Sequence, residues 1–218
     1  MTIAAIIPPG ALVFDVGAHA GTKTQQFLDW GAGRVVAFEP QPWRAAELRK
    51  RFCEPTCQRY GDVLVEELAL GSAPGSLPML ICEKADAIST LEPKWKTGRF
   101  KNEADWNKTI EVQVDTLDRM IAKHGLPAFI KIDVECFEQR VLAGLSQPIA
   151  CISIEFHVEF AEDARTCVDK MRALGHTEFN MGRFHGDDFV LPRWVSAQQI
   201  LSRIPIECGG DIYGRIRS

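Results

Sequence analysis

The chain has 218 residues, of which 46% are hydrophobic, and a formal net charge of −4. This length and composition suffice for one folded core, so we expect a single domain over residues 1–218. The weak negative charge excludes a general attraction to nucleic acid, and no apolar stretch approaches the ~20 residues of a membrane-spanning helix.

Continuous apolar runs alternate with helical patterns along the chain. The runs are apolar and β-branched at odd and even positions alike, as strands covered on both faces are. They predict strands at 11–16, 34–39, 63–70, 128–135 and 149–156, with helices at 22–30, 42–52, 138–145 and 160–174. This alternation predicts an α/β fold with a doubly wound, mostly parallel sheet, whose ligand lies at the carboxyl ends of the strands.

Three further segments stand outside this alternation. Residues 75–82 predict an extra strand after a Gly- and Pro-containing turn. Residues 83–108 are polar, mixed in charge and without clear periodicity, so we expect an inserted loop or cap there. Residues 176–182 and the terminal 210–218 predict a closing antiparallel pair of strands.

The first strand leads into a glycine loop, VFDVGAHAGTKT at 13–24, and the second strand ends in an acid, Glu39. Such a unit is typical of a nucleoside site, in which the acid accepts hydrogen bonds from ribose hydroxyls. A dinucleotide fingerprint needs glycine at positions 15, 17 and 20, where this chain has Asp15, Gly17 and Ala20. Asp15 would repel a pyrophosphate but suits an ammonium group, so the pattern favours S-adenosylmethionine. Alternatively, Asp15 caps the following helix and Glu39 is a solvated strand end.

A second group of charged residues lies near the ends of two later strands. Lys131, Asp133 and Glu135 alternate with apolar residues and are therefore expected on one face of their strand. The next strand ends with Glu155 and His157. Three carboxylates and an imidazole at adjacent strand ends indicate a reaction centre. The alternative is a structural ion-pair cluster, in which Lys131 neutralises Asp133 or Asp15.

Within this group we expect His157 to act as the base that deprotonates an acceptor hydroxyl, with Asp133 as the second choice. Carboxylates and a histidine also suit Mg²⁺ or Mn²⁺, which would lower the pKa of the hydroxyl instead. We favour the version without a metal, because Lys131 on the same face would compete for the carboxylates.

The segment KWKTGRFK at 94–101 combines four basic residues with Trp95 and Phe100. Aromatic rings beside hydrogen-bond donors can stack on a sugar or an apolar ring, and the basic groups favour an anionic acceptor. The segment therefore predicts contact with an acceptor. An ordinary solvated loop is the alternative.

The motifs quoted above occur in the order typical of a known family. DVGAHAGTKT, VVAFEP, LALG, VDTLD, FIKIDVECFEQRVLAGL and IEFH resemble the FkbM family of S-adenosylmethionine-dependent O-methyltransferases. The resemblance implies a Rossmann-like fold, methyl transfer to a hydroxyl of a sugar, polyketide or other small metabolite, and release of S-adenosylhomocysteine. It implies cofactor contacts at Asp15, Gly17, His19, Gly21, Thr24, Glu39, Pro40, Ala69 and Leu70. The acceptor side would involve Trp95, Phe100 and Lys131.

Two residues depart from that family pattern. His19 stands where the family usually has asparagine, and Cys136 stands where it usually has glycine. Two other functions remain open: a nicotinamide-dependent oxidoreductase on the same architecture, and a non-catalytic protein that binds an adenosyl ligand. The glycine spacing and Asp15 argue against the first of these.

Cysteine usage bears on the location of the protein. Seven cysteines are scattered through apolar segments, which favours reduced thiols over a disulfide framework. The first residues, MTIAAIIPPGA, lack the basic region and the long apolar segment of a signal peptide. We therefore expect a cytoplasmic protein.

Overall fold

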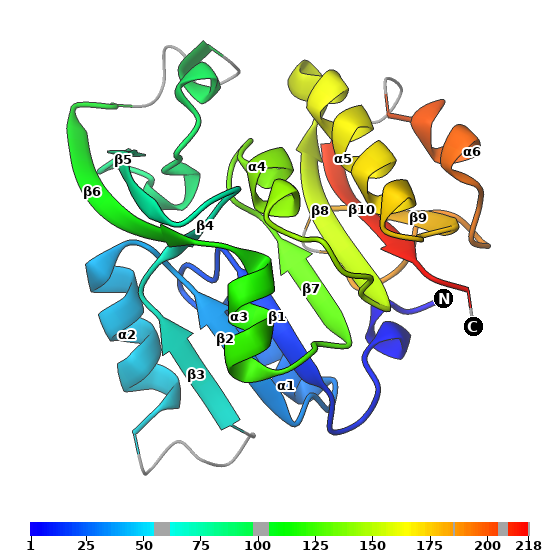
Figure 1. The fold of residues 1–218 in the computed structure, drawn as a ribbon, viewed down its shortest axis with the longest axis horizontal. Helices are drawn as coiled ribbons and strands as arrows, with labels where there is room; N and C mark the ends of the chain where they lie inside the picture. Colours follow the sequence, from blue (N-terminus) through cyan, green and yellow to red (C-terminus); the bar gives the residue numbers. More distant parts are fainter. Residues whose placement is uncertain (55–61, 98–104, 185, 205–208, 218) are drawn as a thin grey trace.

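A seven-stranded sheet forms the centre of the molecule (Figure 1) in a computed structural model that describes residues 1–54, 62–97, 105–184, 186–204 and 209–217. The strand order is β3-β2-β1-β7-β8-β10-β9. Neighbouring strands pair in parallel along β3, β2, β1, β7 and β8, whereas β10 lies antiparallel between β8 and β9. The expected sheet with its closing antiparallel pair is therefore confirmed. The strands are β1 Leu12–Val16, β2 Arg34–Phe38, β3 Asp62–Glu66, β7 Phe129–Ile132, β8 Cys151–His157, β9 Glu178–Gly182 and β10 Gly209–Arg215.

Helices cover both faces of this sheet, which explains why its strands are apolar at odd and even positions alike. Val13 packs into one hydrophobic cluster with Phe27 of α1 and Leu48 of α2, while its neighbour Phe14 packs into another with Val141 of α4. The helices are α1 Thr22–Asp29, α2 Pro42–Phe52, α3 Leu117–His124, α4 Glu138–Ala143, α5 Ala161–Ala173 and α6 Ala197–Leu201. Helices α3 and α6 were not predicted. Short 3₁₀ turns occupy Ile3–Ile6, Asp86–Ile88, Pro93–Thr97 and Val158–Phe160.

A smaller sheet with the order β4-β6-β5 lies beside the large one. It consists of β4 Ala69–Leu70, the expected extra strand β5 Gly75–Ile81, and the unpredicted strand β6 Lys108–Asp115. The single strand expected at 63–70 is wrong, because the chain leaves the large sheet after β3 and pairs β4 with β6 instead. Glu66 and Glu67 lie where β3 ends and the chain turns toward β4. Glu66 pairs with Lys123 of α3, and Glu67 pairs with Arg49 of α2.

The strand expected at 128–135 ends early, at Ile132. Glu135 and Cys136 have φ angles of +56° and +74°, so the chain turns sharply there. The buried Glu138 carboxylate accepts a hydrogen bond from the Val134 N–H at 3.0 Å and supports this turn. Glu135 therefore reaches the strand ends through a turn and not through the alternation expected from the sequence.

Two expectations from composition can be compared with the structure. No helix in the described part of the chain is long and apolar enough to cross a membrane. The cysteines that the structure describes are free thiols, namely Cys53, Cys82, Cys136, Cys151 and Cys167.

Candidate functional site

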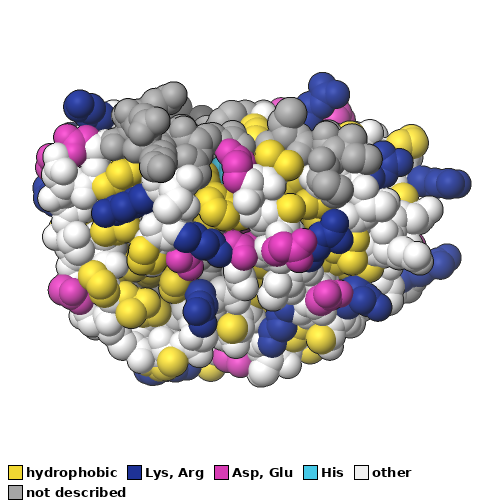
Figure 2. All heavy atoms as spheres, turned by 90° about the horizontal axis from the view of Figure 1, so that it is seen from above, with side chains coloured by type: hydrophobic (Ala, Val, Ile, Leu, Met, Phe, Trp, Pro, Cys, Tyr) yellow, Lys and Arg dark blue, Asp and Glu magenta, His cyan; other side chains and the backbone are white. Residues whose placement is uncertain are grey.

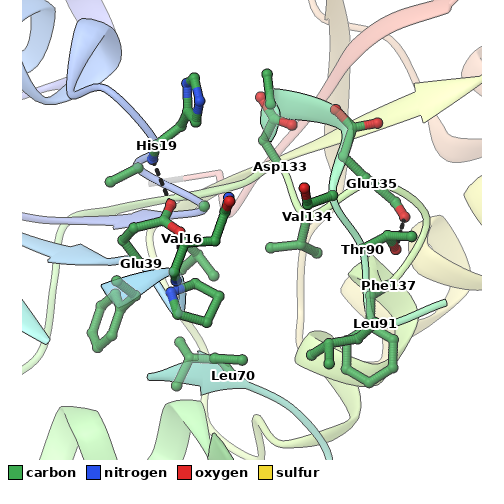
Figure 3. Close-up of a pocket in the computed structure, with 18 of the residues that line it drawn as sticks. Val16, His19, Glu39, Leu70, Thr90, Leu91, Asp133, Val134, Glu135 and Phe137 are labelled. Carbon is green, nitrogen blue, oxygen red and sulfur yellow. Dashed lines mark hydrogen bonds between the residues drawn. The ribbon is translucent and has the colours of Figure 1, made fainter. Parts of the chain in front are cut away.

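A cavity of about 380 Å³ opens at the carboxyl ends of the parallel strands, a size typical of small-molecule sites. His19, Glu39 and Leu70 form one wall, and the turn 133–135 forms the other (Figure 3). The lining residues are Val16–Ala20, Thr22, Lys23, Phe38–Gln41, Leu68–Leu70, Met79, Ala87–Leu91, Lys131, Asp133–Glu135, Phe137 and Glu155. Of the expected cofactor residues, Gly17, His19, Glu39, Pro40, Ala69 and Leu70 lie in this lining.

Gly17 brings the first loop against the second wall. Its φ is +82°, and a Cβ atom there would lie 1.8 Å from the carbonyl oxygen of Asp133. The Gly17 and Ala18 N–H groups donate to the Phe38 carbonyl at 3.0 and 3.1 Å. The loop after β1 is thus fixed between the ends of β2 and β7, and only glycine fits at this position.

The Glu39 carboxylate joins two loops at the cavity wall. Its oxygens accept hydrogen bonds from the His19 N–H at 2.7 Å (Figure 3) and the Gln41 N–H at 2.9 Å. Glu39 is only 2% exposed, and burial raises its pKa to about 7. Because each carboxylate oxygen has two lone pairs, both oxygens keep capacity for a ligand hydroxyl.

Asp15, Gly21 and Thr24 are not among the described residues that line the cavity. Asp15 is fully buried and accepts a hydrogen bond from the Thr24 hydroxyl at 2.6 Å. A Cβ atom on Gly21 would lie 2.5 Å from the ring of Phe52, so Gly21 permits close packing of α1 on α2. These residues therefore support the cavity from behind, and their direct contact with a cofactor stays a prediction.

Asp86, in the segment between β5 and β6, is a site residue that sequence reasoning missed. Its carboxylate accepts two hydrogen bonds from the Arg44 guanidinium, both at 2.7 Å, and lies 3.1 Å from the His19 imidazole. The hydrogen bonds from Arg44 hold the pKa of Asp86 well below its usual range. Asp86 therefore fastens the segment to the glycine loop and to α2. A single acid in a polar stretch gave no signal of this role.

The same segment crosses the cavity, as expected for a cap. Ala87–Leu91 line it, and the Thr90 hydroxyl donates to the Glu135 carbonyl at 2.6 Å (Figure 3). Trp95 is fully buried, its ring centre lies 4.7 Å from that of His157, and its indole N–H donates to the Ile88 carbonyl at 3.1 Å. Trp95 is not among the described residues that line the cavity, so its contact with an acceptor stays a prediction. Phe100 lies outside the described residues.

The molecular surface above the strand ends is mixed in charge. Figure 2 shows Lys and Arg side chains interspersed with Asp and Glu on this face, with hydrophobic side chains between them. The side chains coloured by type in this view therefore form no continuous field of one sign, and the selectivity of the site must come from inside the cavity.

Lys131 occupies the centre of a buried acidic group. Its ammonium lies 2.9 Å from Asp133 and 3.8 Å from Asp15, so the ion pairs that the sequence offered as an alternative are present. Burial acts to raise the pKa of Asp133, but Lys131, the hydrogen bond to Glu155 and the nearby His157 together outweigh burial, and the pKa is lowered. Burial and the charge of Asp133 raise the pKa of Glu155 well above its usual range. A side-chain hydrogen bond joins Glu155 to Asp133.

His157 stands behind these acids. Its Nε2 atom lies 3.3 Å from Glu155 Oε2 and 3.7 Å from Glu135 Oε2. The imidazole packs between Trp95 and Phe184, with ring centres 4.7 and 5.6 Å away, and is not among the described residues lining the cavity. The structure thus brings together the three expected carboxylates and the imidazole, with the carboxylates toward the cavity.

Comparison with known proteins identifies the family. A model of the methyltransferase FkbM domain matches residues 15–180. This chain is an FkbM-family methyltransferase domain. It is 30% identical over 160 residues to the 31-O-demethyl-FK506 methyltransferase FkbM of Streptomyces tacrolimicus, covering 63% of this chain and 60% of that relative. A methyltransferase FkbM structure from Methylobacillus flagellatus KT aligns with a TM-score of 0.54 at 16% identity, over 94% of this chain and 43% of that one. The chain therefore spans less than two thirds of either relative.

The two departures from the FkbM pattern share one structural property. His19 and Cys136 both have positive φ angles, +47° and +74°. Asparagine and glycine, which the family usually has there, adopt this conformation more readily than other residues. This chain therefore adopts positive φ angles at both positions with residues that favour them less than asparagine and glycine do. Burial raises the pKa of the Cys136 thiol far above its usual range, so the thiol stays protonated.

Asp211 of β10 was also missed by sequence reasoning. It pairs in register with Glu155 of β8 and is only 8% exposed. Burial and the charge of Asp133 raise its pKa to about 7. Asp211 therefore extends the acidic group from β8 to the antiparallel end of the FkbM sheet.

Gly17→Ala tests the close approach of the two walls. The added methyl group meets the Asp133 carbonyl, and positive φ costs roughly 1–2 kcal/mol for a residue with a Cβ. We expect the free energy of unfolding, measured with urea, to fall by about 2 kcal/mol or more. Gly75→Ala is the control, since a Cβ there meets nothing within 4 Å. Equal stability of the two variants would contradict the contact.

Burial of Glu39 predicts a pH-dependent stability. The folded protein holds the Glu39 proton up to about pH 7, whereas the unfolded chain releases it near 4.5. Stability therefore falls as pH rises between these values, at up to about 1.4 kcal/mol per pH unit from this group. Urea unfolding at several pH values should show a smaller fall for Glu39→Gln than for wild type, because only the contribution of Glu39 is removed and Asp211 and Glu155 still contribute. Parallel pH profiles for both proteins would show that Glu39 is not held in its neutral form.

Proposed function

We propose that this chain is an S-adenosylmethionine-dependent O-methyltransferase acting on a hydroxyl of a small molecule, such as a sugar or polyketide. The observation that carries the proposal is a cavity in an FkbM-family domain that has the buried Glu39 on one wall and carboxylates on the other. The name of the Streptomyces relative describes that protein as a methyltransferase of 31-O-demethyl-FK506.

The residues present fit this cofactor. Glu39 keeps acceptor capacity for the ribose hydroxyls, and Gly17 fixes the loop beside it against the Asp133 wall. Leu70, Met79 and Ile88 supply apolar contacts for the adenine. The carboxylates of the cavity outnumber its two lysines, Lys23 and Lys131, which favours a ligand with ammonium and sulfonium groups.

S-adenosylmethionine, when bound, supplies a methyl group already activated by its sulfonium. The chain must hold the acceptor in line and accept the proton of its hydroxyl. We assign Asp133 as the group that accepts this proton. Asp133 lines the cavity, and its ion pair with Lys131 lowers its pKa and so keeps it ionised. His157 is the first choice from the sequence, but it is not among the described residues that line the cavity. It lies behind Glu155 and holds that side chain in position.

Thermal unfolding with S-adenosylhomocysteine tests cofactor binding. At 100 times its Kd this ligand should stabilise the protein by about 2.7 kcal/mol, or roughly 5–10 °C for a chain of this size. Glu39→Gln should lose most of the shift, because the ribose hydroxyls lose one carboxyl oxygen that accepts their hydrogen bonds. Glu54→Gln, at an exposed glutamate, is the matched control.

NAD is the comparison ligand in that experiment. Stabilisation by NAD and none by S-adenosylhomocysteine would contradict the proposal and favour the oxidoreductase. Equal shifts for wild type and Glu39→Gln would remove Glu39 from the site.

Turnover separates an enzyme from a non-catalytic binder. A screen of hydroxylated small molecules, with product mass detection, should find an acceptor. With it, Asp133→Asn should lower kcat about 10²–10⁴-fold and leave S-adenosylhomocysteine affinity within a few-fold, whereas His157→Gln should have a smaller effect. An unchanged kcat in Asp133→Asn would show that the proton goes elsewhere.

A further inference from the structure

We propose that Glu135, Glu155 and His157 bind one divalent cation at the edge of the cavity. One ligand atom from each residue lies within 4.8 Å of the other two. The His157 Nε2 atom is 3.3 Å from Glu155 Oε2 and 3.7 Å from Glu135 Oε2. Neighbouring ligands of a cation with bonds of about 2.1 Å are roughly 3 Å apart. Small side-chain movements therefore complete the site.

The three side chains are held in place by the fold. The imidazole of His157 packs between the rings of Trp95 and Phe184. The Glu135 carbonyl is fixed by the Thr90 hydroxyl, and Glu155 lies in β8 between two paired strands. Such support around the ligands keeps the cost of organising a metal site low.

Lys131 does not compete for these ligands, contrary to the expectation from the sequence. Its ammonium pairs with Asp133 at 2.9 Å and faces Asp15 at 3.8 Å. The reason for favouring a site without a metal therefore no longer applies to Glu135 and Glu155. Asp133 belongs to the Lys131 pair and not to the proposed cation site.

Further acids surround the two glutamates. Asp133 and Glu138 lie near Glu155, and Asp211 pairs in register with it. Lys131 is the buried lysine among the described residues, and it pairs with Asp133. This surplus of acids over buried lysines favours a cationic ligand.

The donor set and the cavity indicate which cation and what role. Two carboxylates with one imidazole suit a first-row divalent ion such as Mn²⁺ better than Ca²⁺, which prefers oxygen ligands throughout. Glu135 and Glu155 line the large cavity, so an open coordination position would face the acceptor. There the cation lowers the pKa of the acceptor hydroxyl. The acceptor O–H bond breaks and its proton passes to Asp133, while the oxygen bonds to the methyl carbon and the C–S bond of S-adenosylmethionine breaks, which leaves S-adenosylhomocysteine. This role rests on the proposed function, whereas cation binding does not.

Titration of chelator-treated protein with MnCl₂, followed by the electron paramagnetic resonance signal of free Mn²⁺, tests the site without cofactor or acceptor. We expect one bound Mn²⁺ per chain, with Kd raised at least tenfold in Glu155→Gln and in His157→Gln. Asp133→Asn should stay within about threefold of wild type. Glu162→Gln is the matched control, at a glutamate whose side chain is 89% exposed on α5.

The variants must be folded for the result to count, so urea unfolding of each is measured in the absence of metal. Absence of stoichiometric Mn²⁺ binding to wild type would overturn the site, as would equal binding by wild type, Glu155→Gln and His157→Gln. S-adenosylhomocysteine binding without metal is measured separately. Mn²⁺ binding without S-adenosylhomocysteine binding would contradict the proposed cofactor and support the cation site. S-adenosylhomocysteine binding without Mn²⁺ binding would support the cofactor and contradict the cation site.

Discussion

The buried ammonium group of Lys131 is the interaction on which the candidate site depends. It lies in β7, 2.9 Å from Asp133 at the end of its own strand and 3.8 Å from Asp15 on the neighbouring β1. Burial raises the pKa of the Asp15 carboxyl, and Lys131 is the ion-pair partner that most opposes this rise. Asp15 in turn accepts the hydrogen bond of Thr24 in the first turn of α1. One cation therefore fixes two strand ends and the helix that follows the glycine loop.

The two cavity walls built on this centre differ in chemistry, and one segment joins them. The Glu39 wall offers hydrogen-bond acceptors beside apolar side chains, whereas the turn 133–135 offers carboxylates. Asp86 fastens the covering segment to His19 and Arg44 at one wall, and Thr90 fastens it to Glu135 at the other. A ligand in either half of the cavity therefore meets the same covering segment.

The sequence predicted the features that depend on local pattern. Strands such as β1 and β2 are apolar at odd and even positions alike, because both faces of the sheet are covered. Since the strands are parallel, Glu39 and Asp133 lie at the same edge of the sheet. It did not predict features that depend on distant partners. The division of 63–70 into β3 and β4 requires β6, the role of Asp86 requires Arg44, and the burial of Trp95 requires the ring of His157. The early end of β7 depends on Glu138, which supports a turn that alternation alone cannot reveal.

The most direct test of this account is a calorimetric comparison of S-adenosylhomocysteine with its 2′-deoxy analogue, on wild type and Glu39→Gln. If Glu39 accepts the ribose hydroxyls, wild type should bind the analogue about tenfold or more weakly, as for a lost hydrogen bond to a charged group. Glu39→Gln should bind the two ligands with nearly equal affinity. The same loss in both proteins would contradict the placement of the ribose at Glu39, and no binding of either ligand to wild type would contradict the cofactor cavity itself.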